Sequence, residues 1–144
     1  MHWLVVTGAG LLVLLGVAHA LLTLTSKREG GGMTPTDPRV QEAMGVVGGL
    51  GLAPDLQTTL WRAWVGFNLS HALGLVVSGL VIGLPPLLGS SVPLENAWWL
   101  VAALALPATY SIVSARYWFQ QPTTALSLAT LLICAGLLGS WLAG

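Results

Sequence analysis

The chain has 144 residues, of which 55% are hydrophobic and only 7% are charged, and its formal net charge is zero. A soluble globular domain carries about 25% charged residues, so this composition excludes a protein whose whole surface faces water. The mean hydropathy of +0.81 favours an integral membrane protein, and the absence of net positive charge argues against a nucleic acid partner.

Four apolar stretches, at 3–25, 59–83, 97–117 and 123–143, are long enough to span a membrane. Crossing about 30 Å of hydrocarbon takes about 20 helical residues. The first stretch lacks the positive start of a signal peptide, and we therefore expect it to be a retained helix. The short turn 120–122 predicts that the last two helices are antiparallel neighbours. We predict an all-α four-helix membrane bundle, with residues 1–144 forming a single transmembrane domain.

The long loop at 26–58 is expected to hold a short amphipathic helix on the membrane surface. Asp37 and Pro38 form a helix start, because a capping side chain precedes a proline at the first helical position. Val40, Met44 and Val47 then recur at helical spacing. Glycines at 48, 49 and 51 are expected to end this helix, and Pro54-Asp55 to start an extension of the second span. The segment from Leu84 to Pro93, which contains Pro85 and Pro86, is not expected to be helical throughout.

The basic residues predict the orientation. All five Lys and Arg lie at one side of the predicted bundle, in the first loop or at the adjoining helix ends. The positive-inside rule makes that side cytoplasmic, so both termini are expected outside, in a bacterial inner membrane. The tryptophans fall at predicted helix ends, where an indole suits the headgroup region: Trp3, Trp98, Trp99 and Trp141 at the outer side, and Trp61, Trp64 and Trp118 at the cytoplasmic side.

Small residues predict how the helices pack. Gly66, Ser70, Gly74 and Ser78 recur every four residues along the second span. Such a ridge lets another backbone approach closely, and close contact drives helix association in lipid. We therefore expect this helix to lie centrally in the bundle, with a structural role for the ridge.

Polar residues inside the spans gather in the predicted cytoplasmic half. His19 and Asn68 are expected about 10 Å from the cytoplasmic helix ends, from the helical rise. Asn68 and His71 share a face of the second span, because they are three residues apart. The candidate ligand-binding pocket comprises His19, Asn68, His71, Tyr110, Ser114 and Arg116. The competing interpretation is that these side chains only pair helices by hydrogen bonds.

The sequence predicts no catalytic residues and no metal site. The predicted spans contain no Asp or Glu in their interiors, which argues against a carboxylate proton relay. Ser70 and His71 are adjacent on a helix and do not face each other, so they form no nucleophile–base pair. A single cysteine, Cys134, supplies neither a disulfide nor a thiolate cluster. Haem or chlorophyll binding through His19 or His71 is a minor alternative, and otherwise no cofactor is expected.

Two segments resemble a family of small four-helix bacterial membrane proteins without a known function. The first is the run from Trp64 to Gly74, of pattern WxGFNxSHxxG, and the second is the RYWFxxP pattern from Arg116 to Pro122. The resemblance extends from the first helix to the fourth. It implies the four-helix fold and marks Asn68, Ser70 and His71 as positions of interest, but it implies no activity.

Two functions are consistent with these features. We expect a non-catalytic accessory subunit of a larger respiratory or photosynthetic membrane complex, because the chain is small and has almost no part outside the membrane. Its partners would then be lipids and other membrane subunits. The alternative is a stand-alone protein, an enzyme included, that binds a lipid-like or other hydrophobic small molecule in the polar pocket. Arg62 and Arg116 would then meet an anionic headgroup.

Overall fold

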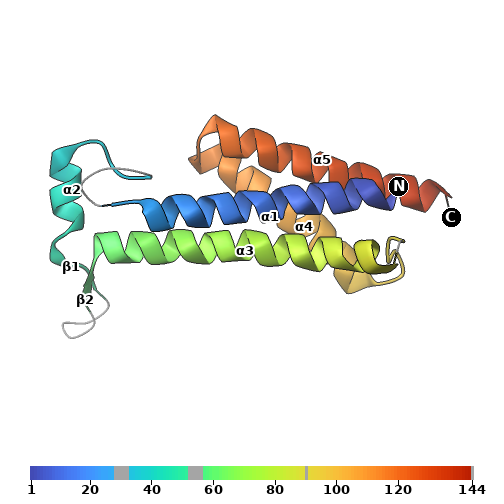
Figure 1. Ribbon diagram of the computed structural model, residues 1–144, viewed down its shortest axis with the longest axis horizontal. Coiled ribbons are helices and arrows are strands. Elements are labelled where there is room, and N and C mark those ends of the chain that lie inside the picture. The colour runs from blue at the N-terminus through green and yellow to red at the C-terminus, as the bar shows by residue number, and fades with distance from the viewer. Residues whose placement is uncertain (28–32, 52–56, 90, 144) are drawn as a thin grey trace. The chain divides into compact units, whose positions relative to one another are not determined.

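The computed structural model describes residues 1–27, 33–51, 57–89 and 91–143, and it is mainly helical (Figure 1). Four helices are long and apolar enough to cross a membrane: α1 (His2–Thr25), α3 (Leu60–Gly89), α4 (Ala97–Tyr117) and α5 (Gln120–Ala143). The remaining helix, α2 (Pro38–Met44), is short. By the length and composition of its helices, the chain is suited to be a multi-pass membrane protein.

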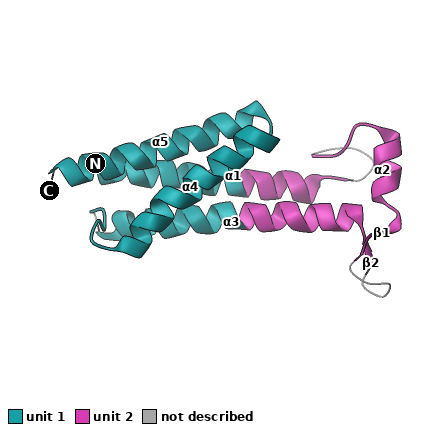
Figure 2. Cartoon of the chain, turned by 180° about the vertical axis from the view of Figure 1, so that it is seen from behind, with its two compact units in different colours: residues 1–16, 74–144 teal, residues 17–73 magenta. Residues whose placement is uncertain are grey.

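The chain divides into two compact units, which are described separately (Figure 2). The first unit comprises Met1–Gly16 and Gly74–Gly144, and the second comprises Val17–Leu73. Helices α1 and α3 each contribute residues to both units. The expectation of a single domain at 1–144 is not decided by this division.

Helix α3 continues through Pro85 and Pro86 to Gly89, six residues beyond its expected end at 83. A proline inside a helix removes the N–H that would bond the carbonyl four residues earlier. For Pro85 that carbonyl belongs to Val81, and it accepts a hydrogen bond from the indole Nε1 of Trp99 at 3.0 Å. Trp99 is buried and belongs to α4, so a neighbouring helix satisfies the group that the proline leaves without an intrahelical donor.

The connection between α4 and α5 is shorter than expected. Trp118 is extended and its N–H donates to the Ser114 carbonyl, which ends α4. Helix α5 then begins at Gln120, three residues before the expected 123, because Pro122 falls in the first turn, where a missing N–H costs nothing. Hydrogen bonds between the hydroxyls of Ser111 and Thr130 (2.9 Å) and of Ser114 and Thr123 (2.8 Å) join the two helices in antiparallel order.

The first loop holds α2 followed by a short antiparallel ribbon of β1 (Val47–Gly51) and β2 (Gln57–Thr59). The Asp37 side chain accepts from the Arg39 N–H and caps α2, as the sequence predicts. The helix ends at Met44 with Gly45 as its C-cap, before the expected glycines.

The ribbon was not expected from the sequence. It pairs Val47 with Thr59 and Gly51 with Gln57 across a bulge, and Gly48 takes a φ of 83°, which glycine adopts without strain. Val47 therefore belongs to a strand and does not extend the apolar face of α2. The expected helix start at Pro54-Asp55 lies outside the described residues, and α3 begins at Leu60.

Glycines set the closest helix contacts of the first unit. A Cβ added to Gly8 of α1 would lie 2.7 Å from the Ala129 carbonyl oxygen of α5, and one added to Gly136 would lie 2.9 Å from the Val5 nitrogen. On α3, a Cβ at Gly79 would lie 2.6 Å from the Ala9 carbonyl oxygen. Helix α1 is therefore in backbone contact with both α5 and α3. The core around these contacts includes Val5, Ala9, Leu12, Ile82, Ala103, Ala129 and Ile133.

The predicted ridge on α3 has two different halves. Gly66 and Ser70, in the second unit, are exposed, and a Cβ on Gly66 would meet no atom within 4 Å. In the first unit, Gly74 contacts the Tyr110 hydroxyl and Ser78 is buried, with its hydroxyl bonded to the Gly74 carbonyl. The tightest approach of α1 lies one position further on, at Gly79.

Candidate functional site

The second unit brings His19, Asn68 and His71 together from two helices. His19 lies near the end of α1, and Asn68 and His71 lie one turn apart on α3. The His19 Nε2 and Asn68 Oδ1 atoms are 3.0 Å apart, and the His19 and His71 ring centroids are 5.4 Å apart. Asn68 is only 2% exposed, whereas both histidines are partly buried. The sequence pattern had predicted this proximity.

The hydrogen bonds of Asn68 determine the tautomer of His19. The Asn68 amide nitrogen Nδ2 donates to the Trp64 carbonyl at 2.8 Å, and a carbonyl only accepts. The Asn68 Oδ1 must therefore be the atom that faces His19. An amide oxygen also only accepts, so His19 Nε2 carries the proton in this bond. In a neutral imidazole the lone pair then lies on Nδ1.

A second buried group supports His19 from its own helix. Thr23 is 1% exposed, and its hydroxyl donates to the His19 carbonyl at 2.8 Å. This bond along the helix satisfies the Thr23 hydroxyl locally. Among the described residues, no buried side-chain nitrogen or oxygen lacks a hydrogen-bond partner. The polar groups of this cluster therefore lie in the apolar helices at little cost in desolvation.

Aromatic rings continue the cluster along α3. The His19 and His71 rings meet edge to face, at an interplanar angle of 67°. On its own helix, His71 lies nearly parallel to Phe67, with centroids 6.4 Å apart at 21°. One turn earlier, Trp61 and Trp64 stack at 5.2 Å and 15°. We call Trp61, Trp64, Phe67 and His71 the aromatic row; its member Phe67 is 65% exposed.

The other candidate residues belong to the first unit. Tyr110 is partly buried against the core, where its hydroxyl contacts Gly74. Ser114 is 4% exposed and its hydroxyl bonds to Thr123, so it joins α4 to α5. Arg116 is exposed in the last turn of α4, and Arg62 is exposed at the start of α3 in the second unit. Within the first unit, Ser114 thus serves to join two helices.

The geometry limits which cofactors fit the histidines. Their rings contact each other edge to face, which leaves no space for a macrocycle between them. Haem with both histidines as axial ligands therefore does not fit, whereas one histidine as a single ligand is not affected by this argument. The described part of the chain contains no group of three or more His, Cys, Asp or Glu side chains placed to hold a metal ion.

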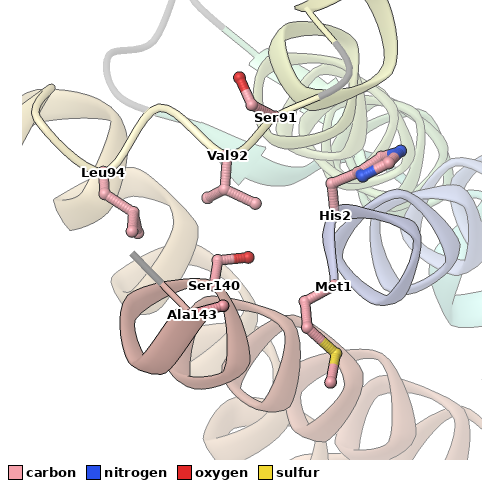
Figure 3. A pocket seen from close by; sticks show the side chains of 7 residues that line it. All are labelled: Met1, His2, Ser91, Val92, Leu94, Ser140 and Ala143. Atoms are coloured by element: carbon pink, nitrogen blue, oxygen red, sulfur yellow. The ribbon is translucent and has the colours of Figure 1, made fainter.

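A pocket at the start of α1 was not predicted from the sequence. Figure 3 shows this pocket of about 280 Å³, lined by Met1, His2, Ser91, Val92, Leu94, Ser140 and Ala143. Its residues come from the start of α1, the α3–α4 connection and the end of α5. They are far apart in sequence, and no periodic pattern joins them. Polar residues near the ends of spans, such as His2 and Ser140, were the only available signal.

Comparison with known proteins gives no assignment: no protein-family model, no curated protein and no solved structure matches the chain.

Proposed function

We propose that this protein is a non-catalytic subunit of a larger membrane assembly of respiratory or photosynthetic type. The main observation in support of this proposal is the aromatic row on α3. Stacked indoles at Trp61 and Trp64 lead to Phe67, which is 65% exposed on a helix long and apolar enough to span a membrane. Aromatic side chains are enriched at protein interfaces, because they offer a large and rigid contact area. The row is suited to receive a helix of a partner subunit.

The polar cluster supports the same proposal. Asn68 uses its amide oxygen for His19 and its amide nitrogen for the Trp64 carbonyl. Thr23 and the Ser114–Thr123 pair are likewise bonded within their own units. The His19–Asn68 and Ser114–Thr123 bonds join neighbouring helices, and the other two satisfy polar groups within one helix, which is the use expected of such groups in a subunit without chemistry of its own. The row beside them is then held in a defined position.

The membrane and orientation are part of the proposal. We place the chain in a bacterial inner membrane, with both termini outside and the loop 26–58 in the cytoplasm. The support is the distribution of basic residues along the chain: Lys27 and Arg39 lie in the loop, Arg62 at the start of α3 and Arg116 at the end of α4. On the predicted apolar face of α2, Met44 is buried, whereas Val40 is 45% exposed.

Site-specific photo-crosslinking in cells tests the aromatic row as an interface. A photoreactive phenylalanine analogue replaces Phe67, and the matched control carries it at Leu73, which is 63% exposed on the same helix. These positions are six residues apart and point in different directions from the helix axis. We expect a discrete protein adduct from position 67 and only lipid adducts from position 73. Lipid adducts alone from both positions would contradict the proposal.

A second candidate function is the binding of a hydrophobic small molecule at the His19–Asn68–His71 cluster. The observation that favours it is the position of the His71 ring, partly buried between the His19 ring and the exposed Phe67. A small molecule with a flat polar head would stack on these rings. For a tetrapyrrole, His19 or His71 alone would coordinate the central metal ion. Visible absorbance of the purified protein and organic extraction test this candidate. Only a 280 nm protein band together with an extract free of any stoichiometric compound would reject it.

A further inference from the structure

An apolar groove runs between α1 and α3 in the first unit. It has a volume of about 120 Å³ and is walled by Val6, Gly10 and Val13 on one side and by Leu80, Leu84 and Leu87 on the other. Its floor is the tight contact of Ala9 and Val13 with Gly79 and of Ala9 with Gly83, where the glycines let α1 approach α3 closely. A Cβ on Gly10 would meet no atom within 4 Å, so this wall is open.

The surroundings of the groove are hydrocarbon if both helices span the membrane. Leu80 and Leu84 are each 42% exposed, and no polar side chain lines the groove. A narrow apolar channel of this kind matches a single chain of methylene groups, which gains dispersion contacts along both walls. An acyl chain therefore matches the chemistry of the groove.

The pocket of Figure 3 lies close to one end of this groove. His2 is four residues before Val6 on α1, about 6 Å by the helical rise, and Ser91 is four residues after Leu87. The pocket of about 280 Å³ combines apolar side chains with the hydroxyls of Ser91 and Ser140 and the imidazole of His2. The Ser140 hydroxyl points toward the middle of the pocket (Figure 3). The Ser91 hydroxyl and the His2 imidazole are turned away from that middle in the same view, so the Ser140 hydroxyl is the donor that faces a phosphate oxygen there.

Exposed indoles place this end of the helices at the headgroup level. Trp3, Trp98 and Trp141 are 61%, 86% and 68% exposed, and each lies next to a residue of the pocket or at the helix end beside it. Tryptophan favours the boundary between hydrocarbon and headgroups. A polar pocket at this depth and an apolar groove leading toward the membrane interior have the two-part chemistry of a phospholipid.

We propose that the first unit binds one phospholipid, with an acyl chain in the α1–α3 groove and the phosphodiester in the pocket of His2, Ser91 and Ser140. This site is separate from the His19–Asn68–His71 cluster and from the aromatic row. It therefore stands or falls independently of the proposed function. The combination of pocket and groove favours a lipid over a free phosphate, which would use the pocket alone, and over a partner helix, which would leave the donors without acceptors.

Native mass spectrometry of the delipidated full chain tests the proposal. The probe is dipalmitoyl phosphatidylethanolamine, titrated in detergent. Gly10→Leu fills the groove from its open wall, and Gly66→Leu is the matched control, because a Cβ at Gly66 also meets no atom within 4 Å. We expect one lipid per chain for the wild type and the control, and at least tenfold weaker binding for Gly10→Leu. Equal retention by both variants would overturn the proposal.

A second experiment tests the contacts with the lipid headgroup. Dipalmitoylglycerol, which has the same chains without phosphate, is expected to bind the wild type at least tenfold more weakly. The Ser91→Ala, Ser140→Ala double variant should abolish this preference, whereas Ser127→Ala on α5 should preserve it. Displacement of the lipid by glycerol 3-phosphate alone would overturn the proposal in favour of a soluble phosphate. A Gly10-dependent dimer in place of a lipid adduct would overturn it in favour of a second copy of the chain.

Discussion

The hydrogen bond between His19 and Asn68 provides a sharp test of how α1 and α3 are held together in the second unit. The perturbation is Asn68→Leu, which keeps the branched shape of the side chain and removes both polar atoms. It deletes the 3.0 Å bond to His19 Nε2 and the 2.8 Å bond to the Trp64 carbonyl. Since Asn68 is only 2% exposed, water does not replace these partners.

The expected magnitude follows from the two groups left behind. A hydrogen bond between membrane helices contributes about 0.6 kcal/mol on average and about 1.7 kcal/mol at most. A donor left unsatisfied in a buried site costs about 1–3 kcal/mol, and the partial exposure of His19 places its N–H at the lower end. We therefore expect Asn68→Leu to lower the free energy of unfolding by about 1.5–3 kcal/mol.

A double-mutant cycle isolates the bond itself. Unfolding of the wild type, His19→Leu, Asn68→Leu and the double variant is followed by far-UV circular dichroism in mixed micelles. The double variant should lose about 0.6–1.7 kcal/mol less than the sum of the single losses, because the bond can be removed only once. Thr25→Val, which deletes a bond within α1 alone, should cost less than about 0.5 kcal/mol. Strict additivity of the two single variants would refute this account of the contact.

Three further outcomes are expected. In a Cys134→Ala background, a membrane-impermeant thiol reagent applied to intact cells should label a cysteine at Ser91 and not one at Lys27; the reverse pattern would invert the proposed topology. Trp99→Phe should lower the free energy of unfolding by about 1–2 kcal/mol, because it removes the donor to the Val81 carbonyl, and a loss no smaller in a Pro85→Ala background would contradict that cause. Gly136→Val should prevent α5 from packing against the α1 backbone at Val5, whereas Gly66→Val should be tolerated. Equal melting temperatures of these two variants would show that the α1–α5 contact is not tight.

Apolar length alone predicted the spans, because it depends only on local composition. The first and third spans were expected at 3–25 and 97–117 and occur at His2–Thr25 and Ala97–Tyr117. The second was expected to stop before Pro85. It continues because the Trp99 indole, on another helix, bonds the carbonyl that the proline cannot serve. This hydrogen bond comes from a distant part of the chain, so the sequence around Pro85 does not predict it.

The ribbon and the helix contacts show a second limit. Its strand Val47–Gly51 contains three glycines and no apolar alternation, so the sequence gives no strand signal there. The regular spacing of Gly66, Ser70, Gly74 and Ser78 indicated a continuous packing face. Of these four, Gly74 does contact the Tyr110 hydroxyl, but the close approaches to a neighbouring backbone lie at Gly8, Gly79 and Gly136. Several faces of a membrane helix carry small residues, and the sequence does not say which face meets a partner.

The proximity of His19, Asn68 and His71 could be predicted for a simple reason. Asn68 and His71 share a helix face by their spacing, and the matching depth of His19 made a contact plausible. Asn68 does bond His19, and the two histidine rings meet. The role of Phe67 beside His71 was not predicted, because a phenylalanine on an apolar helix carries no distinguishing signal. The pocket of His2, Ser91 and Ser140 depends on three distant segments and was equally inaccessible.

The most direct test of the proposed function is native mass spectrometry of the chain extracted from its own membrane in a mild detergent, without overexpression. The account predicts that it is released as a defined assembly with other membrane subunits in fixed stoichiometry, and that Phe67→Ala dissociates it while Leu73→Ala does not. A monodisperse monomer or homo-oligomer without any other subunit, unchanged by Phe67→Ala, would contradict the account.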